Sequence, residues 1–360
     1  MKRGVVGLIA GVAGLTVTGA AAGAAVHRRR SIAGRSLGRE HELGSLRATP
    51  LTVVADDGVP LHVEVDEVDE VDRPEQGDGG AAGPVTVVLV HGYALNLDCW
   101  HFQRAALRGR LRTVLYDQRS HGRSGRSEPE HATIDQLGSD LARVLEEVTE
   151  GPVVLVGHSM GGMTLLALAE QRPELFADRV VGVGLVATAA GGLQPHKSVL
   201  PMLPSTIGGE LSTRLVALLS RGHHAVDGVR RLGRDVAFVA TDMFAFGGPV
   251  PETMLAFVDD MLAATPFEVL ADFFPSFRRL DKYAALGALE GVPTVVVGAT
   301  KDRMTPIRLS RRLAEGVPGA ELVECEGAGH LVILEQHERV DEALATLVER
   351  ATELARERAA

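Results

Sequence analysis

Aromatic residues are scarce in this chain: Phe, Trp and Tyr together make up 4% of its 360 residues, and there is a single Trp. Hydrophobic residues nevertheless reach 45%. A chain of this length and composition can bury a sizeable core, and it suits one large domain or one domain with an insertion.

Cysteine and positive charge are also in short supply. The two cysteines, Cys99 and Cys325, stand outside any CxxC or Cys/His ligand spacing, which argues against a zinc site. We expect two buried thiols, and a disulfide between them is left open. The formal net charge is −10 and the body of the chain has no basic tract, which argues against nucleic acid as the main partner.

Residues 4–26 form an apolar run of 23 residues without a charge, with Lys2 and Arg3 before it and Arg28–Arg30 after it. This length is sufficient to span a bilayer. We expect residues 1–30 to form an N-terminal transmembrane segment, with a slight lean to a cytoplasmic position for the rest of the chain. The alternative is a secretory signal cleaved near Ala24, which makes the mature protein a secreted one.

Beyond a predicted polar linker at 31–50, apolar strands alternate with helices. The run 51–65 has two alternating segments around Asp57-Gly58, which predicts a hairpin, and the acidic, Gly- and Pro-containing run 66–84 predicts a surface loop. Continuous apolar strands with helical spacing between them then follow at 85–90, 112–117, 152–157, 179–188, 292–300 and 320–325. Fully apolar strands in this rhythm imply a parallel sheet that helices cover on both faces.

The alternation stops at about residue 190 and resumes at about residue 286, and the intervening sequence is typical of helices and loops. We therefore predict an α/β fold in two parts, 51–190 and 286–360. Its central sheet is mostly parallel with helices on both faces, and a helical cap at 191–285 is inserted into it.

One short stretch, "VLVGHSMGGM" at 154–163, carries chemistry. A strand, a Gly-x-Ser-x-Gly turn and a helix form a nucleophile elbow, in which Gly157 and Gly161 let strand and helix pack closely around Ser159. The alternative is a glycine-rich turn that holds a phosphate, but neither a P-loop nor a GxGxxG pattern is present. Ser159 is therefore the predicted nucleophile.

A serine nucleophile needs a base and a group that orients the base, in the chain order Ser, acid, His. Asp302 follows one predicted strand in "GATKDRMTP", and His330 follows the next strand in "EGAGHLVILE". We predict these two residues as acid and base. The backbone N–H groups of Met160, which opens the helix, and of Tyr93, in "VLVHGYALN", are the predicted oxyanion hole.

A third strand-end loop, "YDQRSHGRSGR" at 116–126, offers rival candidates. We expect Asp117 and Arg119 to tie loops together. Ser124 is a rival serine, but it lacks the elbow spacing and does not open a helix after a strand.

The stretches "HGYALN", "DQRSHGRSG", "GHSMGGM", "GATKDRMTP" and "GAGHLVILE" span residues of about 85 to 335. On these stretches the chain resembles the α/β-hydrolase superfamily, and it is especially similar to bacterial, actinobacterial-type members with an N-terminal apolar segment. The resemblance implies the α/β-hydrolase fold and the same roles for the triad and oxyanion residues named above. Serine in place of aspartate at the elbow speaks against epoxide hydrolase or haloalkane dehalogenase chemistry.

We expect a serine hydrolase, in the first place a carboxylic ester hydrolase of esterase or lipase type. Its expected substrate is a small apolar ester, and no metal or organic cofactor is implied. C–C bond hydrolysis, acyl transfer and cofactor-free perhydrolysis are alternatives on the same fold. An alternative from another class is a non-catalytic, membrane-tethered binding protein.

Phenylalanine is unevenly distributed: eight of the ten lie between Phe238 and Phe277, inside the predicted cap. They either form the cap's own core or line an apolar slot for an acyl chain. Met202, Met243 and Phe244 are the predicted substrate-binding residues, because flexible Met side chains adapt to varied chain shapes.

Overall fold

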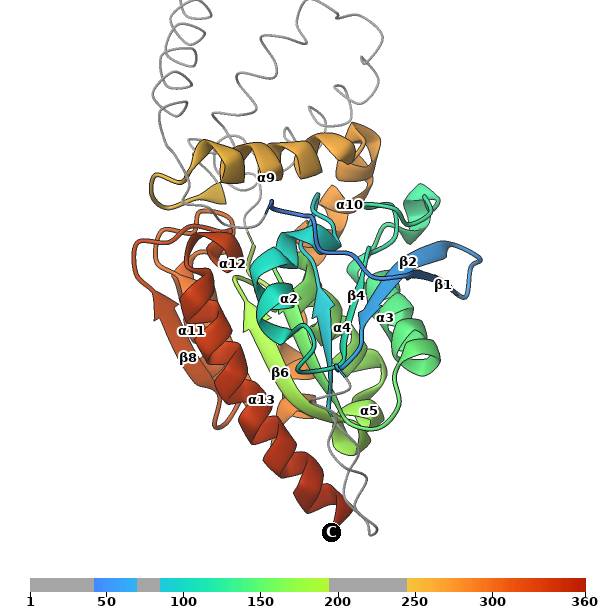
Figure 1. Cartoon of the computed structure of the whole chain (residues 1–360), viewed down its shortest axis with the longest axis vertical. Coiled ribbons are helices and arrows are strands. Elements are labelled where there is room, and N and C mark those ends of the chain that lie inside the picture. The colour runs from blue at the N-terminus through green and yellow to red at the C-terminus, as the bar shows by residue number, and fades with distance from the viewer. Residues whose placement is uncertain (1–41, 70–84, 194–244) are drawn as a thin grey trace, which may run out of the picture.

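The structure, a computed structural model, describes residues 42–69, 85–193 and 245–360 (Figure 1). The apolar run 4–26 lies outside the described residues, so the N-terminal anchor stays a prediction. Within the three described ranges, no helix is long and apolar enough to cross a membrane.

A mostly parallel sheet of eight strands forms the centre, in the order β1-β2-β4-β3-β5-β6-β7-β8. Its strands are β1 (Pro50–Val54), β2 (Pro60–Asp66), β3 (Thr86–Val90), β4 (Thr113–Tyr116), β5 (Val153–His158), β6 (Val180–Val186), β7 (Thr294–Ala299) and β8 (Glu321–Cys325). The pairs β1–β2 and β2–β4 are antiparallel, and the remaining pairs are parallel. The predicted hairpin is confirmed, and Gly58 in its turn has the positive φ, +88°, that glycine adopts without strain.

Helices cover both faces of this sheet, as predicted. One face carries α2 (His101–Leu107), α12 (Val332–Glu335) and α13 (His337–Ala359). The other carries α3 (Ile134–Val148), α4 (Met160–Gln171), α5 (Pro173–Asp178) and α11 (Ile307–Gly316). Short 3₁₀ helices lie at η1 (Leu97–Trp100), η2 (Pro129–His131) and η3 (Tyr283–Leu289).

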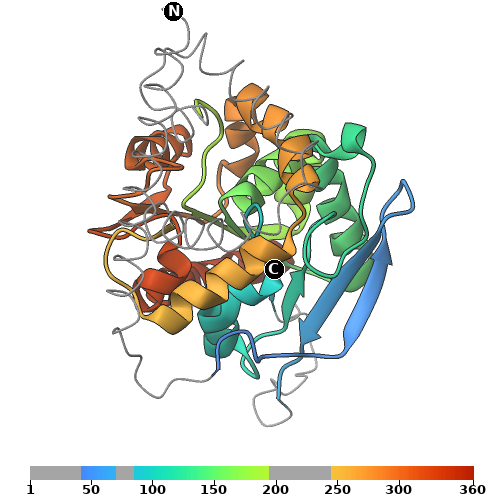
Figure 2. The ribbon, with the colours of Figure 1, turned by 90° about the horizontal axis from the view of Figure 1, so that it is seen from above.

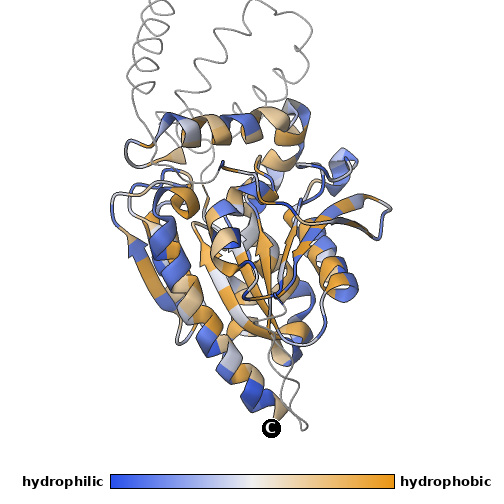
Figure 3. Cartoon of the chain, in the orientation of Figure 1, coloured by the Kyte–Doolittle hydropathy of each residue, from blue (hydrophilic) through white to orange (hydrophobic). Residues whose placement is uncertain are grey.

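Alternation along the strands explains the two layers. In β3, Val87 and Leu89 pack in the core under α13, whereas Val88 and Val90 pack in the core under α3 and α4. A strand buried on both faces has to be apolar throughout, and Figure 3 shows the central strands as continuous apolar ribbons. The long helix α13 is mixed in colour there, because one side faces the sheet and the other faces solvent.

Two helices form the described part of the predicted cap: α9 (Glu252–Ala264) and α10 (Phe267–Arg279). Figures 1 and 2 show α9 crossing above the end of the sheet, while the β1–β2 hairpin lies at the edge of the molecule. Proline precedes each helix, at 251 and 266, where its fixed φ favours a helix start.

Cys99 and Cys325 are buried free thiols, so the expectation of two buried thiols is confirmed and the disulfide alternative is wrong. Residues 42–49, the described part of the predicted linker before β1, lie against the body of the protein. Gly44 N–H donates to Nδ1 of His101 at 3.2 Å, and Nη1 of Arg104 donates to the carbonyl of Leu46 at 3.2 Å.

Candidate active site

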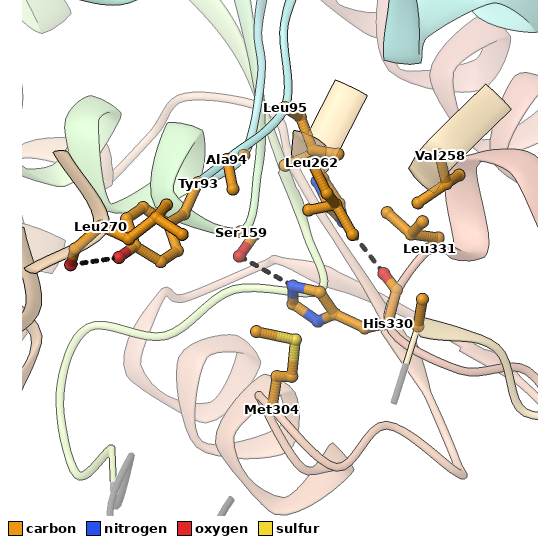
Figure 4. Close-up of a pocket in the computed structure, with 13 residues that line it drawn as sticks. Tyr93, Ala94, Leu95, Ser159, Val258, Leu262, Leu270, Met304, His330 and Leu331 are labelled. Atoms are coloured by element: carbon orange, nitrogen blue, oxygen red, sulfur yellow. Dashed lines mark hydrogen bonds between the residues drawn. The ribbon is translucent and has the colours of Figure 1, made fainter. Parts of the chain in front are cut away.

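The structure brings Ser159, Asp302 and His330 together at the carboxyl ends of β5, β7 and β8. The Ser159 hydroxyl lies 2.8 Å from Nε2 of His330 (Figure 4). Nδ1 of His330 lies 2.8 Å from Oδ2 of Asp302. All three residues are buried. These contacts permit Ser159 to pass its proton to His330 while Asp302 holds the imidazole.

Ser159 occupies a strained backbone position. Its φ of 53° and ψ of −117° place it outside the regions that L-residues favour, and such strain persists only where the surroundings enforce it. A Cβ on Gly161 would stand 2.0 Å from the carbonyl oxygen of Val90, and one on Gly157 would stand 2.5 Å from the backbone of Gly161. The two glycines of the motif are therefore required by the close packing of β3, β5 and α4.

Thr188, just beyond β6, holds the strained turn from the side. Its hydroxyl donates to the carbonyl of Ser159 at 2.6 Å. A Cβ on Gly162 would stand 2.5 Å from the methyl carbon of this threonine, which is too close for any side chain at that position. The position of the serine thus depends on β6 as well as on its own strand.

Asp302 is fixed by four hydrogen bonds. Oδ1 accepts from the N–H groups of Met304 at 2.7 Å and Thr305 at 2.9 Å, and Oδ2 lies 2.7 Å from the Thr305 hydroxyl as well as 2.8 Å from His330. Burial by itself raises the pKa of this carboxyl, but the charge and hydrogen bond of His330 and the bonds from Thr305 outweigh it, so the pKa of Asp302 is lowered. The carboxylate stays ionised and keeps Nδ1 of His330 as a proton donor.

A second buried histidine supports the first. Nε2–H of His158 donates to the backbone carbonyl of His330 at 2.9 Å. Burial, together with repulsion from the neighbouring His330, lowers the pKa of His158 to about 3, so this imidazole is neutral at ordinary pH. It acts as a fixed hydrogen-bond donor rather than as an acid or a base.

The two predicted oxyanion donors lie beside Ser159. Met160 is the first residue of α4, and the first N–H groups of a helix have no acceptor within the helix. Tyr93 follows β3, and Nδ1–H of His91 donates to the carbonyl of Gly92 at 2.7 Å. Because a trans peptide is planar, this bond also fixes the Tyr93 N–H, which points away from that carbonyl.

His91 can serve in this way because its tautomer is set. Its Nε2 accepts from the N–H of Gln118 at 2.9 Å, which leaves the proton on Nδ1. Burial lowers the pKa of His91 to about 4, so the ring remains neutral. The Tyr93 side chain turns away from the serine, and its hydroxyl donates to the carbonyl of Leu270 in α10 at 2.5 Å (Figure 4).

A cavity of about 300 Å³ opens onto the serine hydroxyl. Apart from Ser159, His158 and His330, its lining consists of Gly92, Tyr93, Ala94, Leu95, Ala245, Val258, Leu262, Leu270, Met304 and Leu331. Met304 is 42% exposed and marks the side of the cavity nearest solvent. The described lining is thus apolar around the Ser159 hydroxyl and the His330 imidazole, without a carboxylate or a guanidinium.

The predicted substrate residues Met202, Met243 and Phe244 lie outside the described residues. Three phenylalanines of the cap, Phe246, Phe273 and Phe277, are buried in the packed core and do not line the cavity. Phe273 and Phe277 are buried against Met160 and Met163 of α4, and Phe246 is buried in the core under α13. One of the two expectations was that cap phenylalanines line the cavity. In the described residues, aliphatic side chains of α9 and α10 line it instead.

The third loop holds structure together, as predicted. Asp117 accepts from the N–H groups of Leu97 and Arg123, each at 2.8 Å. Arg119 forms ion pairs with Asp57 at 2.7 Å and Asp140 at 2.5 Å. The rival, Ser124, donates to the carbonyl of Asp117 instead of facing a histidine base.

Sequence reasoning missed the side chains that orient the predicted site: His91, His158, Thr188 and Thr305. Each is a polar residue in or just beyond an apolar strand, or in the following loop, which was the available signal. Two of their partners, the carbonyl of Gly92 and the carboxylate of Asp302, are close in the sequence. The other partners are backbone carbonyls at the ends of other strands, and no local pattern identifies these. Across the described ranges, no group of three or more His, Cys, Asp or Glu side chains is arranged to hold a metal ion.

A family model described as the alpha/beta hydrolase family matches residues 87–343. The chain belongs to this family, so the predicted fold class and the resemblance to the α/β-hydrolase superfamily are confirmed. The similarity to actinobacterial-type members with an N-terminal apolar segment stays a prediction. The chain is 26% identical over 255 residues to a putative carbamate hydrolase, RutD, of Rhizobium rhizogenes, covering 69% of this chain and 86% of the relative.

It is also 28% identical over 270 residues to the dihydrolipoyllysine-residue acetyltransferase component of the acetoin cleaving system of Pseudomonas putida. That match covers 74% of this chain but 64% of the relative, so the chain spans less than two thirds of that protein.

Solved structures share the fold. A thermophilic esterase from Thermogutta terrifontis superimposes with a TM-score of 0.64 at 23% identity, covering 85% of this chain and all of the esterase. An enol-lactonase from Burkholderia xenovorans gives a TM-score of 0.64 at 24% identity over 83% of this chain and all of the lactonase. These likenesses show that the chain has the same fold.

Proposed function

We propose that this hydrolase cleaves small, neutral, apolar carboxylic esters, with Ser159 as nucleophile, His330 as general base and acid, and Asp302 as the group that orients His330. The observation that carries the proposal is the pair of 2.8 Å contacts linking the three side chains beneath an apolar cavity. The esterase and carbamate hydrolase names among its relatives and structural neighbours support a hydrolytic reaction at a carbonyl.

In this mechanism the hydroxyl oxygen of Ser159 attacks the ester carbonyl while Nε2 of His330 takes its proton. The N–H groups of Met160 and Tyr93 stabilise the oxyanion, and donors of this kind are worth roughly 10²–10³ in rate each. His330 returns the proton to the leaving alcohol. Water then enters, gives a proton to His330 and releases the acid from Ser159.

The cavity lining supports an apolar acyl group. Val258, Leu262 and Leu270 face the serine from the cap helices, and Leu95 and Leu331 face it from the sheet side. Each methylene moved from water into such a slot contributes about 0.8 kcal/mol at most, so a few extra carbons raise kcat/KM by roughly one to two orders of magnitude. A charged group on the acyl chain has no partner in the described lining and loses its hydration there.

A panel of p-nitrophenyl esters tests the proposal. We expect butyrate and hexanoate to be cleaved faster than acetate, and the succinate half-ester, which carries a carboxylate, to be cleaved more slowly than butyrate. Carbamate and alcohol-acceptor arms in the same panel measure carbamate hydrolysis and acyl transfer. Rates that fall steadily from acetate upward contradict the apolar slot.

The role of Ser159 is tested separately. Ser159→Ala is expected to abolish turnover and labelling by a fluorophosphonate probe, whereas Ser124→Ala is expected to retain both. Labelling that persists in Ser159→Ala and disappears in Ser124→Ala refutes the assignment. If the folded wild-type enzyme cleaves none of the substrates and takes up no probe, the proposal of a serine hydrolase fails as a whole.

A further inference from the structure

Glu335, at the end of α12, joins two segments that are far apart in the sequence. Its Oε2 accepts from the N–H of Gly329 at 2.7 Å, next to His330. The same carboxylate accepts from Gly247 at 2.9 Å and from Gly248 at 2.8 Å, in the part of the predicted cap just before α9. Three backbone N–H groups therefore converge on one carboxylate, and bonds of this charge-assisted kind are the stronger ones.

The two segments also contact each other directly. Leu331 N–H donates to the carbonyl of Ala245 at 2.8 Å. A Cβ on Gly247 would stand 2.2 Å from the carbonyl oxygen of Gly327, and one on Gly329 would stand 2.4 Å from the nitrogen of Gly247. The backbones therefore pack without room for a side chain, and the carboxylate of Glu335 closes the contact.

The loop that carries Asp302 joins the same contact. Lys301 N–H donates to the carbonyl of Ala328 at 2.9 Å, and Nζ of Lys301 donates to the carbonyl of Gly247 at 3.2 Å. His330 is thus held at its Nδ1 by Asp302, at its carbonyl by His158, and through the preceding residue by Glu335.

We propose that Glu335 is a positioning residue, which sets the distance between His330 and Ser159 and makes this distance depend on the seating of residues 245–248. The inference rests on the proposed serine hydrolase mechanism. Ala245 lies at the wall of the cavity that opens onto the serine, and it is bonded to Leu331 of the same wall. A shift of residues 245–248 therefore moves one side of the cavity and the base together.

The test compares kcat and KM for a good p-nitrophenyl ester in Glu335→Ala, Glu335→Gln and the control Glu326→Ala. Glu326 is an exposed carboxylate on the same loop, so its removal changes the charge equally. We expect kcat to fall about 100-fold in Glu335→Ala, as displacements of about 1 Å in catalytic groups do, with a smaller change in KM. Glu335→Gln keeps one acceptor oxygen but turns an NH₂ towards N–H donors, and is expected to be intermediate.

Rescue distinguishes positioning from a general loss of structure. Glu335→Ala leaves the three N–H donors and the space of a carboxymethyl group, so added acetate is expected to raise kcat, while chloride at equal ionic strength is not. Gly247→Ala, which forces the two backbones apart, is expected to lower kcat without rescue by acetate. In the double variant the losses are expected to be less than additive, because both changes release the same contact.

An active wild-type enzyme with a folded Glu335→Ala variant of unchanged kcat overturns this inference and leaves the proposed function intact. Loss of kcat that acetate does not restore, accompanied by an equal loss in the control, also overturns it. If Glu335→Ala does not fold, Glu335→Gln decides: wild-type kcat refutes the inference, and lowered kcat with little change in KM supports it. A wild-type enzyme without esterase activity instead refutes the proposed function.

Discussion

We expect three buried histidines, His91, His121 and His158, to make the free energy of unfolding of this protein decrease as the pH falls. Burial lowers the pKa of His91 to about 4 and the pKa values of His121 and His158 to about 3. In the unfolded chain each imidazole returns to a pKa of about 6.5. Between these values the unfolded state binds protons that the folded state does not, so the free energy of unfolding decreases as the pH falls.

The slope follows from counting protons. Near pH 5 each unfolded histidine is almost fully protonated and each buried one is almost neutral, so each contributes about 1.4 kcal/mol per pH unit. The three together give about 4 kcal/mol per pH unit. Domains are stable by about 5–15 kcal/mol in total, so acidification from pH 6.5 towards pH 4 is expected to remove most of the stability.

The variant His121→Phe tests the contribution of one of the three histidines to the pH dependence of stability. The ring packs among Tyr93, His91 and Phe273, and no described residue pairs with its buried Nε2. A phenyl ring therefore suits the site, apart from the lost bond from Nδ1–H to the carbonyl of Arg119. That loss lowers stability at pH 7 by about 1–3 kcal/mol. The dependence of the unfolding free energy on pH is nevertheless expected to become shallower by about 1.4 kcal/mol per pH unit.

Urea unfolding at several pH values between about 7 and 5 measures this slope. His131→Gln, which replaces a side chain that is 42% exposed, controls for the loss of a histidine as such. The reasoning is refuted if His121→Phe keeps the wild-type slope, or if both variants change the slope by the same amount.

Two further predictions concern threonines that hold the site. Thr188→Val removes the donor to the carbonyl of Ser159, and we expect it to lower the free energy of unfolding by about 1–3 kcal/mol and to lower kcat. Thr188→Ser keeps the hydroxyl and is expected to stay close to wild type. A Val variant with wild-type melting temperature and kcat contradicts this prediction. Thr305→Val removes a hydroxyl that lies 2.7 Å from Oδ2 of Asp302 and 2.8 Å from the carbonyl of Ala187. We expect kcat to fall about tenfold in this variant, whereas Thr305→Ser, which keeps the hydroxyl, is expected to retain most activity. Wild-type kcat in Thr305→Val, or a larger loss of kcat in Thr305→Ser than in Thr305→Val, contradicts the role of the hydroxyl.

The layered sheet was predictable because its signal is local. Strands such as β3 and β5 are apolar throughout, which only a sheet covered on both faces tolerates, and the Gly-x-Ser-x-Gly turn marks where β5 passes into α4. The order Ser159, Asp302, His330 could be assigned because each residue follows its own strand, and strand ends of a parallel sheet meet at one edge.

The lining of the cavity was less predictable. A phenylalanine-rich cap sequence is equally consistent with a core and with a slot, since both are apolar. The structure distinguishes them by direction: Phe273 and Phe277 face α4, while Leu262 and Leu270 face Ser159. Which side of a helix faces a partner depends on how that helix crosses its neighbour, and the sequence of the helix alone does not contain this information.

Two of the residues that were missed, Thr188 and Thr305, share one task with Gln118. At the carboxyl edge of the sheet each strand ends, so its last carbonyls leave the hydrogen-bond ladder and need new donors, because a buried carbonyl without a donor is costly. Side chains at the end of the adjacent strand supply them: Gln118 donates to the carbonyl of His91 at 2.7 Å, and Thr188 donates to that of Ser159 at 2.6 Å. The Thr305 hydroxyl lies 2.8 Å from the carbonyl of Ala187 and 2.7 Å from Oδ2 of Asp302, and its single proton serves one of these two acceptors at a time. The pairs follow the order β4–β3, β6–β5 and β7–β6, so side chains extend the ladder one step beyond the sheet. Neighbouring strands of the sheet thereby hold the predicted nucleophile, the loop of the predicted oxyanion hole and the loop of the predicted acid. These bonds between neighbouring strand ends, rather than the motif around Ser159, fix the distances on which the proposed reaction depends.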